Sequence, residues 1–191
     1  DLAHLNPPET LAAILEQTAN LGFSMPSEPR TGAMLRALAA AKPGGRFLEV
    51  GTGTGLATAW LLDGMDRNAR LTSVDIDPRS QAVAREFLGG DPRLQLVTAD
   101  AAGFLHQQNP RSFDLVFADS MPGKYGYLDE ALALLRPGGI YVIDDMLPQA
   151  NWPEGHAQKV PQLMSALASR PDFCIVSLAW SSGLMLAVRS H

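Results

Sequence analysis

Three glycines and a series of acidic residues are the parts of this sequence that could bind a ligand. Gly51, Gly53 and Gly55 stand in the stretch FLEVGTGTGLATAWL, where an apolar run ends and a helix-like run begins. Glycine at that spacing allows a tight turn and lets the backbone approach a ligand closely. No lysine follows as in a Walker loop, and Leu56 stands where the dinucleotide fingerprint has its third glycine. A tight turn without a ligand is the alternative.

Acidic residues recur where strand-like runs end. Six carboxylates lie at or near such ends: Glu49, Asp75, Asp100, Asp119, Asp144 and Asp145. In an open α/β sheet, ligands bind in the crevice outside the carboxyl ends of the strands. A crevice lined by these acids would disfavour a pyrophosphate and favour a sulfonium or a metal ion. Asp75, which closes the second run, could also accept both hydroxyls of a ribose.

Strand-like and helix-like segments alternate along the chain and would bring these residues together. The expected strands span residues 46–50, 71–77, 94–100, 113–119 and 140–145, and the expected helices 56–65, 78–90, 101–108, 128–136 and 153–170. Two further helices, at 8–21 and 30–42, are expected before them. This alternation predicts an α/β fold, a parallel sheet with helices on both faces.

The last part of the chain adds two strands that run in opposite directions. Residues 173–180 and 184–190 are strand-like and are joined by a short turn that contains glycine. Such a short connection requires antiparallel strands, because a parallel crossover takes a dozen or more residues. We therefore predict a Rossmann-like, doubly wound, seven-stranded mixed sheet with one reversed strand at or near an edge.

Composition narrows the class of protein. The 191 residues are 46% apolar and 18% charged, with a net charge of −5, which is ordinary for one globular domain. No cluster of Lys and Arg suggests a nucleic-acid partner, and no apolar run is long enough to predict a membrane span. The single cysteine, Cys174, is expected to be a small buried residue, which fits a cytoplasmic protein.

Five motifs in order resemble those of a known family. FLEVGTGTGLATAWL, LTSVDIDP, VTADA, FDLVFADS and LLRPGGIYVIDDML look like successive motifs of class I S-adenosylmethionine-dependent methyltransferases. More narrowly, they resemble small-molecule O-methyltransferases of the catechol and caffeoyl-CoA type. The resemblance implies the strand order 3-2-1-4-5-7-6 with strand 7 antiparallel. It also implies a helical extension at residues 1–24, as a cap or dimer contact, before a methyltransferase domain at 25–191.

The resemblance implies where S-adenosylmethionine would bind. The matching positions are Glu49, Gly51, Thr52, Gly53, Gly55, Asp75, Ile76, Asp100, Ala101 and Asp119. Asp75 matches the ribose-binding acid, and Ile76 would pack on the adenine. Asp100 and Ala101 match the segment at the adenine edge, although Asp100 could also cap the helix that follows it.

The resemblance also implies a divalent cation and a catalytic lysine. Asp119, Asp144 and Asp145 stand where the catechol-type family has an Asp and an Asp-Asn pair that hold Mg²⁺, with Mn²⁺ or Ca²⁺ as alternatives. Clustered carboxylates repel one another unless a cation neutralises them. The alternative is a metal-free site with a solvated Asp145. Lys124 comes five residues after Asp119, later than the family's lysine, and would either reach the site as a base or face water.

The expected reaction is the in-line attack of an acceptor hydroxyl on the sulfonium methyl group. A small, catechol-like hydroxylated acceptor is expected, in a homodimeric enzyme. The candidates for the acceptor's wall are Met25, Met121, Tyr125, Met146 and Trp152. Three alternatives stay open: a metal-independent methyltransferase, an NAD(P)-dependent oxidoreductase and a non-catalytic cofactor-binding protein.

Overall fold

The computed structural model of the protein describes residues 3–150, 152 and 154–190. Residues 1–2 of the expected extension, and 151, 153 and 191 of the expected domain, lie outside the described residues. In the part that is described, no helix is both long and apolar enough to span a lipid bilayer.

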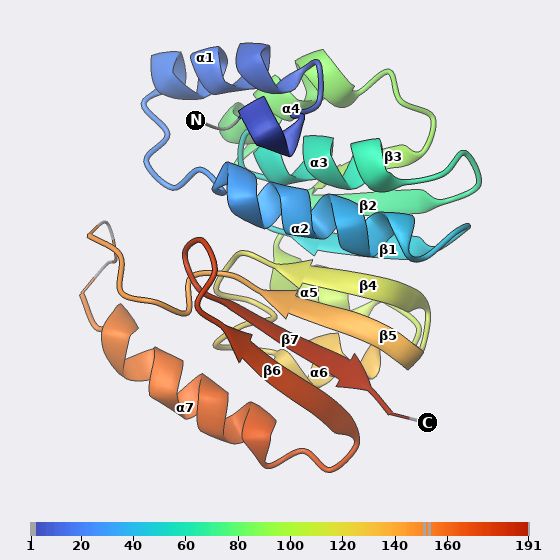
Figure 1. Ribbon diagram of the computed structural model, residues 1–191, viewed down its shortest axis with the longest axis vertical. Helices are drawn as coiled ribbons and strands as arrows, with labels where there is room; N and C mark the ends of the chain where they lie inside the picture. Colours follow the sequence, from blue (N-terminus) through green and yellow to red (C-terminus); the bar gives the residue numbers. More distant parts are fainter. Residues whose placement is uncertain (1–2, 151, 153, 191) are drawn as a thin grey trace.

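Seven strands form a single mixed sheet in the order β3-β2-β1-β4-β5-β7-β6 (Figure 1). They are β1 (Arg46–Val50), β2 (Arg70–Asp75), β3 (Leu94–Thr98), β4 (Phe113–Ala118), β5 (Leu135–Ile143), β6 (Phe173–Leu178) and β7 (Leu184–Arg189). β1 to β5 pair in parallel, whereas β7 runs antiparallel to both β5 and β6. The predicted sheet order and the predicted reversed strand are both confirmed.

Helices cover both faces of the sheet. They are η1 (Ala3–Leu5), α1 (Leu11–Leu21), α2 (Pro29–Ala40), α3 (Leu56–Gly64), α4 (Pro78–Leu88), α5 (Ala101–His106), α6 (Leu128–Ala133) and α7 (His156–Ala168). Alternate strand residues face opposite cores: Phe47 and Leu115 pack with α1 to α4, whereas Leu48 and Val116 pack with α5 to α7. Because both faces are buried, the central strands read as continuous apolar runs.

The helix before β5 ends earlier than the sequence predicts. α6 ends at Ala133 and β5 begins at Leu135, because the backbone N–H groups of Ser112 and Phe113 both donate to the carbonyl of Leu134. The pairing then slips, since Phe113 pairs with Leu135 but Leu115 pairs with Ile140. Residues 136–139 therefore form an irregularity inside the strand and do not stop the helix.

Cys174 is exposed, so the prediction that it is buried was wrong. It lies on β6, the edge strand, and Val176, two residues along on the same face, is 47% exposed. The inner face of β6 is covered, since Phe173 is buried in the core with α7. The apolar sequence of a strand does not reveal that one face of the strand is left exposed to solvent.

Candidate functional site

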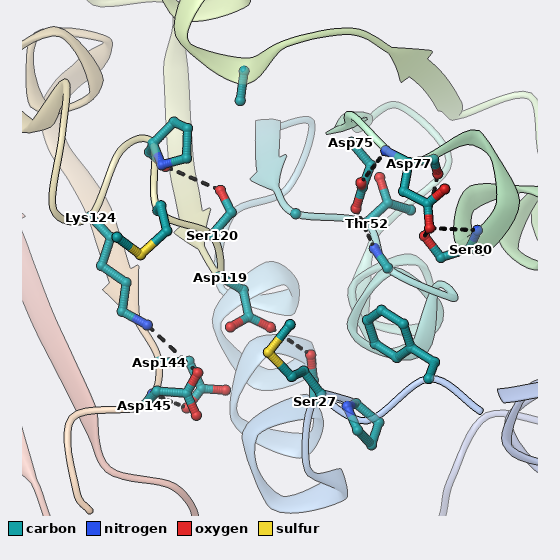
Figure 2. A pocket seen from close by; sticks show the side chains of 18 of the residues that line it. Ser27, Thr52, Asp75, Asp77, Ser80, Asp119, Ser120, Lys124, Asp144 and Asp145 are labelled. Carbon is teal, nitrogen blue, oxygen red and sulfur yellow. Dashed lines mark hydrogen bonds and ion pairs between the residues drawn. The ribbon is translucent and has the colours of Figure 1, made fainter. Parts of the chain in front are cut away.

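A cavity of about 680 Å³ lies at the carboxyl ends of the parallel strands. Its walls come from the segment between α1 and α2, the glycine loop after β1, and the residues that follow β2 to β5. Figure 2 shows Asp75 and Asp77 on one side, and Asp119, Asp144, Asp145 and Lys124 on the other. The cavity therefore occupies the crevice that the strand ends predict.

The glycine loop bounds one side of the cavity with almost bare backbone. Gly51 and Gly53 have φ angles of 105° and 52°, a region that side chains rarely adopt. A Cβ at Gly51 would lie 2.7 Å from the carbonyl oxygen of Asp119, so the fold itself requires glycine there. A Cβ at Gly53 would lie 3.2 Å from Phe23, in the segment that follows α1. Thr52 also lines the cavity.

Asp75 is held in place by the backbone on both sides. Its Oδ2 accepts from the N–H of Gly53 at 2.7 Å, and its Oδ1 accepts from the N–H of Asp77 at 2.8 Å. The adjacent Ile76 is 71% exposed and also lines the cavity. Asp75 can therefore accept hydrogen bonds from the hydroxyls of a sugar, while the exposed Ile76 can pack against a flat ring attached to that sugar.

Asp100 and Ala101 lie further along the same side and line the cavity. Asp100 also caps α5, because its carboxylate accepts from the N–H groups of Ala102 and Gly103 at 3.4 Å and 3.1 Å. The capping role is thus confirmed. Contact of these two residues with a cofactor stays a prediction.

Asp119 and Asp144 form a pair of carboxyl groups that resist ionisation. Asp144 is 2% exposed and accepts from the Ser182 hydroxyl and from the N–H of Asp145. Burial raises its pKa to about 6, and the charge of Asp145 adds to the rise. Burial and then the charge of Asp144 raise the pKa of Asp119 well above its usual range, against a hydrogen bond of 2.9 Å from Ser27.

Lys124 is turned into the cavity and does not face water. Its side chain is only 3% exposed, and its Nζ lies 3.6 Å from Oδ2 of Asp145. The loop folds back because the N–H of Gly123 donates to the carbonyl of Gly126 at 2.6 Å, while the Tyr141 hydroxyl donates to the carbonyl of Gly123. The structure therefore excludes a water-facing Lys124, whereas its role as a base stays a prediction.

The described residues hold no group of three or more His, Cys, Asp or Glu side chains arranged for a metal ion. An oxygen of Asp119 accepts from Ser27, an oxygen of Asp144 accepts from Ser182, and Asp145 pairs with Lys124. Lys124 therefore supplies the neutralising positive charge that the acidic cluster needs. In this arrangement the three acids do not fit the expected divalent cation.

Comparison with known proteins identifies the family. The chain matches the family described as "Methyltransferase domain" over residues 48–146. A protein from Mycobacteroides abscessus named "Putative O-methyltransferase" is 30% identical over 97% of this chain and 90% of its own length. The chain belongs to the class I S-adenosylmethionine-dependent methyltransferases. The family resemblance and the enzyme class expected from the sequence are confirmed, which overturns the oxidoreductase alternative.

Two further comparisons show how much of this methyltransferase matches other proteins in sequence and in fold. A protein from Mycolicibacterium vanbaalenii with the same name is 35% identical over 70% of this chain, but the match spans only 61% of that relative. The structure of the O-methyltransferase TomG from Streptomyces achromogenes, in complex with S-adenosylmethionine, superposes with a TM-score of 0.81. It is 24% identical, and the match covers 96% of this chain and 90% of TomG, which establishes a shared fold.

The methyltransferase buries Glu49, which does not line the cavity. Its Oε2 accepts from the hydroxyls of Thr58 and Ser73, each at 2.5 Å, while its Oε1 has no hydrogen-bond partner. Ser73 is hydrogen-bonded to Thr52 at 2.6 Å, which connects Glu49 to the glycine loop. An influence of Glu49 on the cofactor would therefore pass through Ser73 and Thr52. Because Glu49 does not line the cavity, it cannot contact a ligand there directly.

Glu49 makes stability depend on pH. Burial raises its pKa from 4.5 to about 7. The folded protein thus binds this proton more tightly than the unfolded chain, so stability falls as pH rises through that interval. Between pH 5 and 8.5, we expect the wild type to lose about 2–3 kcal/mol more unfolding free energy than Glu49→Gln, whose side chain does not ionise. Urea unfolding at both pH values measures the difference, and parallel curves would contradict the prediction.

Four of the five candidates for the acceptor's wall are apolar or aromatic residues that line the cavity. Met25, Met121, Tyr125 and Trp152 line the cavity as expected for the wall, whereas Met146 is 8% exposed within the core on the α5–α7 face. The backbone N–H of Met146 donates to the carbonyl of Gly183 at 3.0 Å, which draws the residue toward the closing hairpin.

Three polar residues in the site were missed by the sequence motifs. Ser27 and Ser182 bind the acidic cluster from distant parts of the chain, so no local pattern marks them. His156 lies at the start of α7, 7% exposed, where its Nε2 is hydrogen-bonded to the Tyr125 hydroxyl at 2.9 Å and its ring stacks on Trp152 at 4.4 Å. Burial and the charge of Lys124 lower its pKa, which favours the neutral ring.

Proposed function

We propose that this protein transfers the methyl group of S-adenosylmethionine to a hydroxyl of a small aromatic, catechol-like acceptor. One observation carries the proposal: a single cavity joins the glycine loop and the anchored Asp75 to a buried lysine and two protonatable acids. The glycine loop and Asp75 suit the binding of an adenosine. The lysine and the two acids suit the deprotonation of a hydroxyl. Membership of the methyltransferase family supports this division of the cavity.

The residues on the glycine-loop side fit the cofactor. Gly51 and Gly53 would allow close backbone approach, and Asp75, which the Gly53 N–H holds in place, would accept the ribose hydroxyls. Ile76 would pack on the adenine, with Asp100 and Ala101 at the ring's edge. When bound, the cofactor supplies a methyl group on a positively charged sulfur. The acids that line the cavity favour that positive charge.

The residues on the other side fit proton removal from the acceptor. A hydroxyl placed beside Lys124 would lose its proton to the carboxylate of Asp144, whose pKa of about 6 suits a general base, or to Asp119, whose pKa is also raised by burial. The Lys124 ammonium would stabilise the resulting oxyanion. The oxygen then forms its bond to the methyl carbon as the carbon–sulfur bond breaks, and the sulfur leaves uncharged.

A metal-independent reaction is the form of this function that the geometry favours. The sequence leads us to expect a divalent cation at Asp119, Asp144 and Asp145. Those groups instead bind Ser27, Ser182 and Lys124. A cation would have to displace Lys124 from Asp145 before it could bind there.

Labelled S-adenosylmethionine and a panel of catechol-type phenols test both parts of the proposal. We expect methyl transfer to at least one phenol, at rates that agree within about twofold in Mg²⁺ and in a chelator. A loss of more than tenfold in the chelator, restored by Mg²⁺, would establish the metal-dependent reaction instead. Calorimetric binding of S-adenosylhomocysteine without transfer to any phenol would favour the non-catalytic alternative.

We also propose a cytoplasmic homodimer, as the family resemblance and the cysteine content suggest. Residues of α1 already pack within one chain, since Thr18 donates to Thr54 of the glycine loop at 2.8 Å. This contact suits the capping role of the N-terminal extension. Light scattering of the purified protein measures the subunit number, and a monomeric mass would reject the dimer.

A further inference from the structure

A second cavity, of about 520 Å³, lies between the loop after β4 and α7. It shares Met121, Pro122, Lys124 and Tyr125 with the first cavity, so the two are adjacent. Its opposite wall is α7, which contributes Lys159 and Leu163. A molecule bound at Lys124 could therefore extend past Tyr125 into this second space.

The two cavities differ in charge. Seven acidic residues line the first, whereas no Asp or Glu is found among the described residues that line the second. The charged side chains of the second cavity are Lys124 and Lys159. Asp129 follows the lining residue Leu128, but it pairs with Arg170 and therefore does not neutralise either lysine.

Lys159 is the positive charge left without an acidic partner. Lys124 pairs with Asp145, whereas Lys159 makes no ion pair within the described part of the chain and lies 5.8 Å from the ring centre of Tyr125. Burial and the charge of Lys124 lower the pKa of the neighbouring His156, which favours its neutral ring. Lys159 is half-buried, and a lysine that lies over an aromatic ring without an ion-pair partner can attract an anion.

We propose that the methyl acceptor carries a carboxylate, and that Lys159 binds this group in the second cavity while the reacting hydroxyl lies beside Lys124. The inference rests on the proposed function and names the class of its substrate: a hydroxylated aromatic acid. Tyr125, whose ring centre lies 5.6 Å from the Nζ of Lys124 and 5.8 Å from the Nζ of Lys159, would lie along the acceptor's ring. Lys159 thus acts as a specificity residue and does not touch the reacting atoms.

A matched pair of acceptors tests the proposal. With 3,4-dihydroxybenzoate and its uncharged methyl ester, we expect the wild type to have a kcat/KM about 10- to 100-fold higher for the acid, mainly through KM. Lys159→Gln should remove this preference while the ester's kcat/KM stays within about twofold. Lys42→Gln is the control: it removes the same charge from a lysine that donates to the carbonyl of Gly138, outside both cavities.

The outcomes separate the inference from the function on which it rests. An unchanged preference in Lys159→Gln, or equal use of acid and ester by the wild type, would overturn the role of Lys159 alone. Failure to methylate either compound would overturn the proposed acceptor class as well. Binding of S-adenosylhomocysteine by Lys159→Gln at wild-type strength shows that the variant is folded, because Lys159 does not line the first cavity.

Discussion

Replacing Lys124 with methionine is expected to lower kcat for methyl transfer about 10²- to 10³-fold, the effect of removing one positioned donor to a developing oxyanion. Methionine fills a similar volume but carries no charge. The Lys124 side chain is 3% exposed and its Nζ lies 3.6 Å from Asp145. A cation from the solvent could therefore take its place only if the surrounding side chains rearranged. Affinity for S-adenosylhomocysteine should change by less than about threefold, since Lys124 lies on the side of the cavity opposite Asp75. Steady-state kinetics and calorimetry measure the two effects.

Lys124→Arg distinguishes charge from proton transfer. Arginine keeps the positive charge but does not release its proton, so partial activity would support oxyanion stabilisation. Activity as low as that of Lys124→Met would assign proton uptake to the lysine itself. Lys42→Met is the matched control, because it removes the same charge from a lysine outside the cavity. If Lys124→Met kept more than a tenth of the wild-type activity, that result would contradict the proposed role of Lys124. Circular dichroism shows whether the variants fold, because loss of Lys124 leaves three acids without their cation.

Replacing Asp75 with alanine is expected to weaken binding of S-adenosylhomocysteine about 100-fold. A carboxylate contributes about 1.5–3 kcal/mol for each hydrogen bond that it accepts, so the expected loss of about 100-fold, or about 2.7 kcal/mol, lies just below the lower end of the sum for two ribose hydroxyls. The change also frees the N–H groups of Gly53 and Asp77, which now hold the loop around the acid. Calorimetry with the purified variant measures the affinity.

Asp145→Ala is the matched control for this effect. It removes a carboxylate that lines the same cavity but lies on the side opposite Asp75, so the affinity should fall by less than about threefold. Equal losses in the two variants would mean that the cavity is not divided as proposed. Asp75→Asn separates loop support from ribose binding: its amide oxygen can still accept from the Gly53 N–H, but it lacks the charge.

Much of the framework of this site follows from local sequence patterns. A connection of a few residues between two strands permits only an antiparallel pair, which is why the reversed strand β7 could be predicted. Parallel strands end at the same edge of a sheet, so acids at the end of β2 and just after β3, β4 and β5 had to converge. Asp75, Asp100, Asp119, Asp144 and Asp145 all line one cavity for this reason.

The contacts made by those acids depend on residues far away in the chain, and only the tertiary structure decided them. Ser27 reaches Asp119 across 92 positions, and Ser182 reaches Asp144 across 38. The loop that turns Lys124 inward is also held by the hydroxyl of Tyr141, a residue of the neighbouring strand β5, which donates to the carbonyl of Gly123. Periodicity reports which residues are apolar or charged but not which elements cover them. Met146 therefore lies in the core and not in the wall, Cys174 is exposed, and a lysine balances the acids where a metal ion was expected.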